Sequence, residues 1–177
     1  YLRFMRGVID SEDLPLNISR EMLQNNPVMT SISGAVTKRI LTDLEKKAKK
    51  DVKGYNDFWN NFGAVLKEGI YEDFARRDQI LKISRFHSTA DEELTSLEGY
   101  VSRMGEGQDT IYYITGDSLL AAKRSPQLEG FKAKNIEVLY LTDPVDEFWM
   151  QMVPEFDGKK FGSVTRGAAD LDDKKDD

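Results

Sequence analysis

Apolar residues recur every four positions between residues 28 and 44, the period of one face of an α-helix. The stripe consists of Val28, Ile32, Val36, Ile40 and Leu44, with Met29 and Leu41 beside it. Pro27 suits a first helical turn, and the basic run 46–50 suits a carboxyl-terminal one. We therefore expect a long amphipathic helix that begins near Pro27 and ends before Gly54.

Two more helices are expected before residue 90. The first is strongly aromatic, and its apolar positions are Tyr55, Phe58, Trp59, Phe62, Val65, Leu66 and Ile70. The second is shorter and carries Ile80, Leu81, Ile83 and Phe86. Residues 91–104 have the pattern of a loop with one helical turn. The stretch 27–105 is therefore expected to form a helical segment.

The period changes after the breaker cluster 105–109, our expected boundary of a sub-domain. Residues 110–115 and 136–141 read as strands, separated by about twenty residues of helical pattern. Such a crossover makes the two strands parallel. A further helix follows Pro144, and 156–161 then forms a last strand or hairpin. We expect a small three-layer α/β/α sandwich over 106–167.

Both ends of the chain differ from this middle. Residues 1–9 alternate as in a strand, and an acidic, proline-marked loop follows, so 1–26 is read as a strand with a loop. The polar tail 168–177 is expected to be a disordered acidic linker. The fold class expected for the whole chain is α/β.

Charge and composition exclude several classes of function. The net charge is −6 at pH 7 and the pI is near 5, so neither nucleic acid nor an anionic membrane is the expected partner. No apolar run approaches the roughly 20 residues of a membrane span. The 177 residues contain no cysteine, which suits the cytoplasm. The chain begins with Tyr1 inside the expected strand, so we expect a segment of a longer protein.

The usual catalytic and metal-binding patterns are weak. His87 is the one histidine, which disfavours a Ser-His-Asp triad or a histidine metal site. Asp10, Glu12 and Asp13 could hold a divalent cation, but a solvated acidic turn is the more common outcome. No metal site is expected.

The loop around Arg20 is the first of two features that indicate function. Asn17, Ser19, Arg20 and Gln24 cluster about the first turns of a short helix. Arg20 either pairs with Glu12 or Asp13, or it presents a guanidinium to a phosphate held by another domain. The residues alone leave both possibilities open.

The second feature is the stretch 146–152. Its apolar residues cover more than one helical face, so some of Phe148, Trp149 and Met150 should be exposed. An exposed aromatic and methionine surface indicates protein binding. Burial against the small sheet is the alternative.

The stretch 7–24, GVIDSEDLPLNISREMLQ, resembles the middle-domain catalytic loop of the ninety-kilodalton heat-shock chaperone family. The resemblance continues to about Thr165 through these segments: FW at 58–59, LKEG at 66–69, RFHST at 85–89, LTSL at 94–97, YVSRM at 100–104, IYYIT at 111–115, LTDP at 141–144 and EFDG at 155–158. Residues 58–69 and 103–108 are similar to bacterial members of the family.

The resemblance implies an ATP-driven, Mg-dependent, dimeric stress-response chaperone. Arg20 would reach the γ-phosphate of ATP bound in an N-terminal domain, and Asn17 and Gln24 would support that contact. Client proteins would contact the surface formed by Glu147, Phe148, Trp149, Met150 and Gln151. The nucleotide domain and the carboxyl-terminal dimerisation domain lie outside this chain. We therefore expect the segment alone to bind no ATP and to be inactive as an ATPase. The alternative function is a passive client- or partner-binding module.

Overall fold

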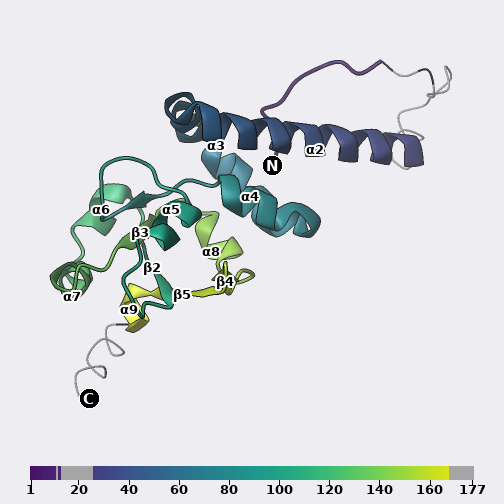
Figure 1. The fold of residues 1–177 in the computed structure, drawn as a ribbon. Helices are drawn as coiled ribbons and strands as arrows, with labels where there is room; N and C mark the ends of the chain where they lie inside the picture. Colours follow the sequence, from purple (N-terminus) through teal and green to yellow (C-terminus); the bar gives the residue numbers. More distant parts are fainter. Residues whose placement is uncertain (11, 13–25, 168–177) are drawn as a thin grey trace.

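A computed structural model describes residues 1–10, 12 and 26–167 of the chain. The structure has two parts that lie side by side: a group of helices formed by the first half of the chain, and a sheet with its own helices formed by the second half (Figure 1). The loop residues Asn17, Arg20 and Gln24, and the tail 168–177, lie outside the described residues.

Helix α2 (Pro27–Lys50) and helix α3 (Val52–Glu72) share a joint of one residue. The backbone N–H of Asp51 donates to Lys47 O at 2.8 Å and closes α2, while its side chain accepts from Gly54 N at 2.9 Å and caps α3. The amino end of α2 is capped by Asn26, whose side chain accepts from Val28 N, and Pro27 occupies the first turn. A 3-10 turn, η1 (Phe74–Arg76), and helix α4 (Arg77–Ile83) follow.

Helix α3 is the buried centre of the helical part. Its apolar face carries Tyr55, Trp59, Leu66 and Ile70. Gly63 permits this packing, because a Cβ atom there would lie 2.5 Å from Cε2 of Trp59. In α2, by contrast, only Leu41 and Ala48 are buried, so most of its apolar stripe borders solvent or the N-terminal segment.

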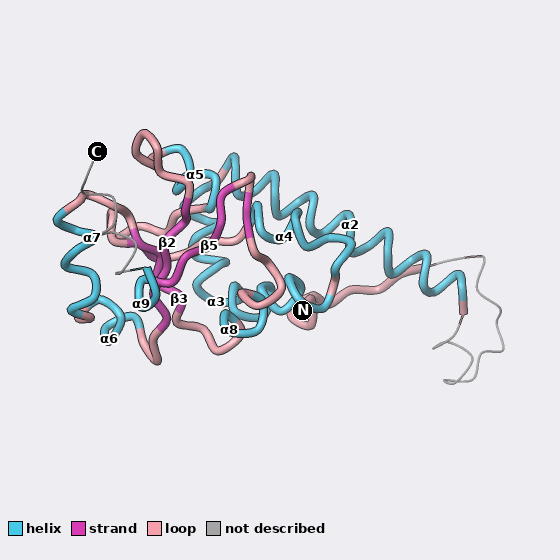
Figure 2. Tube along the Cα trace, turned by 90° about the horizontal axis from the view of Figure 1, so that it is seen from below, coloured by secondary structure: helices cyan, strands magenta, loops and turns pink. Residues whose placement is uncertain are grey.

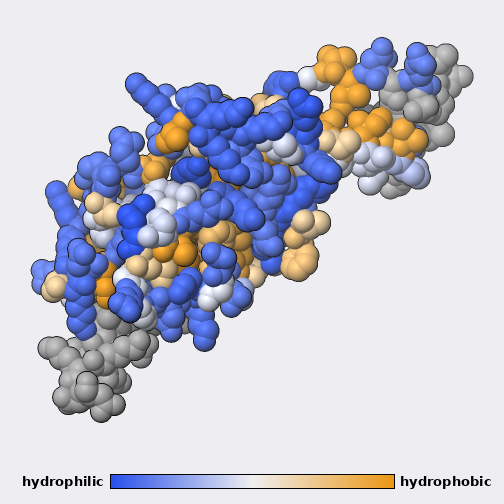
Figure 3. Space-filling model, in the orientation of Figure 1, coloured by the Kyte–Doolittle hydropathy of each residue, from blue (hydrophilic) through white to orange (hydrophobic). Residues whose placement is uncertain are grey.

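The segment before α2 differs from expectation. Residues 1–10 form a turn and an extended run with no strand pairing, so the strand expected over 1–9 is wrong. A strand requires a partner for its backbone groups, and residues 1–10 pair with no strand of the described sheet. Tyr1 is held by its side chain, whose hydroxyl donates to Asp73 at 2.6 Å. Apolar surface gathers at this end of the molecule (Figure 3), where Met5, Val8, Ile9 and Val36 are exposed.

The second half forms one mixed sheet in the order β1-β3-β2-β5-β4. Its strands are β1 (His87–Ser88), β2 (Thr110–Thr115), β3 (Val138–Leu141), β4 (Glu155–Phe156) and β5 (Lys159–Ser163). Both β3 and β5 run parallel to β2, which confirms the expected parallel pair. Strands β1 and β4 are antiparallel edges, and β4 and β5 form the expected hairpin.

Helices cover both faces of this sheet (Figure 2). Helices α6 (Leu119–Lys123), α7 (Glu129–Ala133) and α9 (Val164–Gly167), with the 3-10 turn η2 (Pro126–Leu128), lie on one face. Helices α3, α4, α5 (Leu97–Ser102) and α8 (Asp146–Trp149) lie toward the other. Alternate strand residues divide accordingly: Ile114 and Val138 face α7, whereas Ile111 and Leu139 face α3 and α8. The α/β class with a three-layer sandwich is confirmed.

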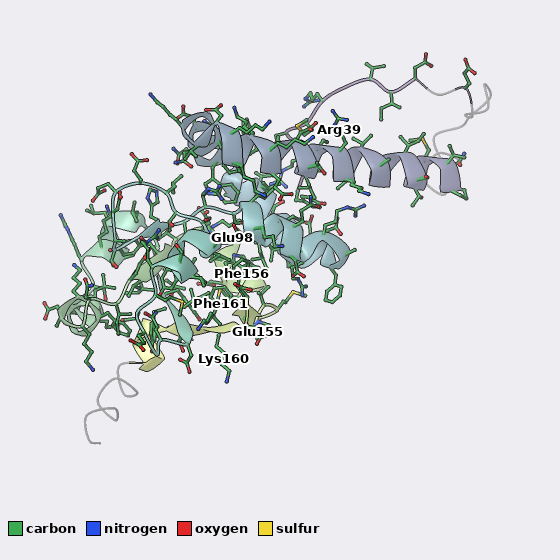
Figure 4. All side chains as sticks on the ribbon, viewed as in Figure 1. Arg39, Glu98, Glu155, Phe156, Lys160 and Phe161 are labelled. Carbon is green, nitrogen blue, oxygen red and sulfur yellow. The ribbon has the colours of Figure 1, made fainter. Side chains whose placement is uncertain are left out.

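One cluster of buried side chains continues from the helices into the sandwich. It includes Leu41 of α2, Tyr55 of α3, Leu139 of β3 and Trp149 of α8. The β4–β5 hairpin closes it from the edge: Phe156 and Phe161 point inward, while Glu155 and Lys160 point away (Figure 4). The helical and sheet parts therefore share one core. The boundaries 1–26, 27–105 and 106–167 remain a prediction.

Candidate protein-binding surface

Helix α8 carries the described part of the predicted site. It begins after β3, where the loop Thr142–Val145 turns the chain onto the face of the sheet covered by α3. Its first residue, Asp146, accepts from Asp143 N at 3.0 Å, which fixes the start of the helix. Asn17, Arg20 and Gln24 lie outside the described residues, so their predicted roles are not tested.

Neighbouring residues of α8 point in opposite directions. Phe148 is 60% exposed, whereas Trp149 is fully buried. Successive positions on a helix are turned by about 100°, and here that rotation carries Trp149 into the core beside Phe161, at a centroid distance of 5.8 Å. The expectation that Trp149 contributes to an exposed surface is therefore wrong. Glu147, Phe148 and Gln151 are exposed and Met150 is half-buried, so a client-binding role for these four stays a prediction.

Phe148 belongs to a larger apolar surface that we call the aromatic patch: Tyr71, Phe74, Phe148 and Met152. Phe74 is 78% exposed and Met152 is 47% exposed. The ring of Tyr71 lies 6.1 Å from that of Phe148. The two phenylalanines together leave on the order of 250 Å² of aromatic surface in solvent. Such a surface is a candidate for an interaction site.

Arg77 joins the two sides of the aromatic patch. Its guanidinium lies over the ring of Phe74, with Cζ 4.6 Å from the ring centre. The same group donates from Nε to Ile70 O at 2.7 Å and from Nη1 to Met152 O at 3.4 Å. One side chain therefore spans the end of α3, the turn η1 and the residues after α8.

A buried ion pair holds α8 against α3. The ammonium of Lys67, 3% exposed, lies 2.6 Å from Oδ1 of Asp146 and 2.7 Å from Oδ2 of Asp143. Asp146, itself 1% exposed, also accepts from Nε1 of Trp149 at 2.8 Å. Buried charges require this degree of pairing. The network fixes the rotation of α8, and hence which of its residues are exposed.

Other chemistry is weakly represented in the described residues. Over 1–10, 12 and 26–167, no group of three or more histidine or acidic side chains could hold a metal ion. In the same part of the chain, no helix is long and apolar enough to cross a membrane. Burial lowers the pKa of His87, with Lys123 adding to the effect.

The sequence pattern did not indicate Tyr71 and Phe74 as part of the patch, and it did not indicate the ion pair. Tyr71 and Phe74 lie between the two expected helices, whereas Phe148 and Met152 belong to the stretch 146–152. Lys67 left no clear signal in the sequence, because Glu68 beside it is also charged and many other positions of α3 are exposed.

Comparisons with known proteins relate this chain to one protein family. The family model described as Hsp90 protein matches residues 1–177. "Chaperone protein HtpG" of Roseobacter denitrificans is 60% identical over 97% of this chain and 28% of that protein. The same-named protein of Rhizobium meliloti is 56% identical over 97% of this chain and 27% of its own length. The chain thus spans about a quarter of these curated relatives.

A solved structure shows the same fold. The middle domain of a Plasmodium falciparum heat shock protein superposes with a TM-score of 0.71 and 30% identity. The match covers 80% of this chain and 60% of that one.

Proposed function

Because the chain belongs to the Hsp90 protein family, we propose that it is the middle segment of an ATP-dependent chaperone and contributes a surface for partly unfolded client proteins. The aromatic patch is the observation that carries this proposal. Unfolded chains expose apolar side chains that a folded protein buries, and Phe74, Phe148 and Met152 offer them an apolar partner. The fold and the relatives named above support the assignment to a chaperone.

The size of the patch fits reversible binding. A stable interface buries about 1,200–2,000 Å² in total, several times the area that Phe74 and Phe148 present. Contact with the aromatic patch alone is therefore weak, which allows a client to be released. Tyr71 and Arg77 hold the exposed rings in place, so little side-chain entropy is lost when a client binds.

Phe148→Ala tests this proposal. Leu120 on α6 provides the matched control, because it is also 60% exposed but lies on the opposite face of the sheet. We expect Phe148→Ala to weaken binding of an unfolded protein at least fivefold in fluorescence anisotropy, and Leu120→Ala to leave it within twofold. Equal binding by both variants would remove the aromatic patch from the client-binding site.

For Arg20 we propose an electrostatic role in hydrolysis. ATP and its Mg²⁺ would be held by a separate N-terminal domain, and the guanidinium of Arg20 would reach the γ-phosphate when that domain closes. Asn17 and Gln24 would hold the loop. A fixed cation stabilises the charge that develops in phosphoryl transfer. The support for this role is the motif at residues 7–24 together with family membership.

Arg20→Ala in the full-length protein tests that role. We expect hydrolysis to fall by orders of magnitude while ATP binding is nearly intact. Arg39→Ala is the control, since Arg39 is an exposed helix arginine whose one ion pair with the described residues is to Asp43, at 2.8 Å. Normal turnover by Arg20→Ala would favour the passive binding module. The 177-residue chain alone is expected to show no turnover.

Family membership also supports two proposals about the full-length protein, on its oligomeric state and its location in the cell. It would be a homodimer, joined through a domain outside this chain, and it would act in the cytoplasm. Size-exclusion chromatography with light scattering measures the first, and cell fractionation measures the second.

A further inference from the structure

A crevice opens where the chain leaves the two central strands of the sheet. From β2 the chain passes to α6 on one face, and from the adjacent parallel strand β3 it passes to α8 on the other. The carboxyl ends of two such strands are the usual place for a ligand in an open α/β sheet. Here they enclose a volume of about 380 Å³, within the range typical of binding pockets.

The lining of the crevice is acidic. It carries three carboxylates, on Asp117 after β2, Asp143 after β3 and Glu147 on α8, and it contains no lysine, arginine or histidine. Asp143 is partly neutralised by the buried ammonium of Lys67. Asp117 and Glu147 are exposed, and neither forms a hydrogen bond or an ion pair with any residue that the structure describes.

Phe148 belongs both to the crevice and to the aromatic patch. It lines the crevice together with Glu147 and Pro144, while its ring also lies 6.1 Å from that of Tyr71. A peptide that places an apolar side chain against Phe148 therefore brings the adjacent residue of the peptide to the carboxylates of Asp117 and Glu147.

This inference rests on the proposed client-binding role of the aromatic patch and specifies which segments it selects. We propose that the crevice is a specificity pocket for a lysine or arginine side chain next to a large apolar residue in the client. The aliphatic stem of such a side chain packs against Phe148 and Pro144, and its cation meets the two free carboxylates. Charge complementarity of this kind selects partners and speeds their encounter.

The size of the effect is limited by solvent. An exposed ion pair contributes modestly, so two of them give about a five- to tenfold preference for a basic over a neutral residue at low salt. Screening weakens the preference as the ionic strength passes 0.1 M, where the Debye length is about 10 Å. Binding through the aromatic patch itself is far less sensitive to salt.

Three unstructured synthetic peptides test the proposal with the whole chain. They share the same leucine and phenylalanine residues and differ only in carrying lysine, glutamine or glutamate beside them. We expect the lysine peptide to bind about five- to tenfold more tightly than the glutamine peptide, and the glutamate peptide to bind most weakly. The double variant Asp117→Asn with Glu147→Gln should bring the lysine-to-glutamine ratio close to one.

A matched double variant controls for net charge. Glu93→Gln with Glu106→Gln removes two exposed carboxylates away from the crevice and should keep the ratio at its original value. Equal affinity for all three peptides, or a ratio that survives the crevice variant, would overturn the specificity pocket and leave the client-binding role standing. Failure of every peptide to bind, or full binding by Phe148→Ala, would instead overturn the client-binding role.

Discussion

Replacing Lys67 with methionine should destabilise the protein more than any surface change of similar size. Methionine matches the length of the stem and removes only the charge. Asp146 would then be a buried carboxylate with two remaining donors, Trp149 Nε1 and Asp143 N, and no cation. Removing one partner of a buried ion pair lowers the free energy of unfolding by about 3–5 kcal/mol. This is a large part of the roughly 5–15 kcal/mol by which a typical domain is stable.

The control is Lys123→Met. The ammonium of Lys123 lies 2.8 Å from Glu92, nearly the distance that separates Lys67 from Asp146, but Glu92 is 89% exposed. Such a pair contributes less than about 1 kcal/mol. The two ion pairs have nearly the same N···O distance but differ in burial. The difference between the two variants therefore measures the effect of burial on the stability that an ion pair contributes.

Urea unfolding followed by circular dichroism measures both variants. For a chain of this size, the loss at Lys67 corresponds to a fall in Tm of roughly 6–20 °C. Asp146→Asn should cost less, because the ammonium keeps Asp143 at 2.7 Å. The double variant Lys67→Met with Asp146→Asn should recover part of the loss, since the fully buried charge is removed and the remaining carboxylate of Asp143 is partly exposed. A cost at Lys67 no greater than that at Lys123 would refute the reasoning.

Three further changes have definite expectations. Tyr100→Phe removes a buried hydroxyl that donates to Glu137 O at 2.6 Å and accepts from a β2 amide, so chemical denaturation should show a loss of about 1–3 kcal/mol. Burial lowers the pKa of His87 below the unfolded value of 6.5, so its contribution to stability is complete above pH 6.5 and is lost as the pH falls toward the folded pKa. His87→Asn should flatten that part of a stability curve measured from pH 8 to 5.5, and an unchanged slope would contradict the assignment. Gly63→Ala should lower Tm and alter tryptophan fluorescence because the new Cβ meets the ring of Trp59, and an unchanged spectrum would contradict this packing.

Sequence patterning identified the elements whose signal is local. The period of four in α2, the strand pattern of 110–115 in β2 and the crossover to β3 each depend on residues near one another in the chain, and the structure confirms all three elements. The antiparallel edge β1 was not predicted, because two residues at His87–Ser88 carry no period and pair only with distant Tyr140 and Leu139.

The site was harder to predict than the fold. Periodicity showed that 146–152 has apolar residues on more than one face, but it could not decide which of Phe148 and Trp149 is buried. That choice depends on Lys67, a residue 79 positions from Asp146 that fixes the rotation of α8. The motif around Arg20 raises the opposite difficulty: the sequence is specific, yet its role depends on a nucleotide held by another domain.

The joint at Asp51 and the ion pair at Lys67 together have a mechanical consequence. A single residue joins α2 to α3, and the buried ammonium of Lys67 clamps α3 to α8. To swing α2 and α3 as one unit past the sheet, a force would have to draw that ammonium from between two carboxylates and open a shared core. We therefore expect α3 and α8 to move together as one body. Torque applied to α2 by a neighbouring domain would turn the aromatic patch with it.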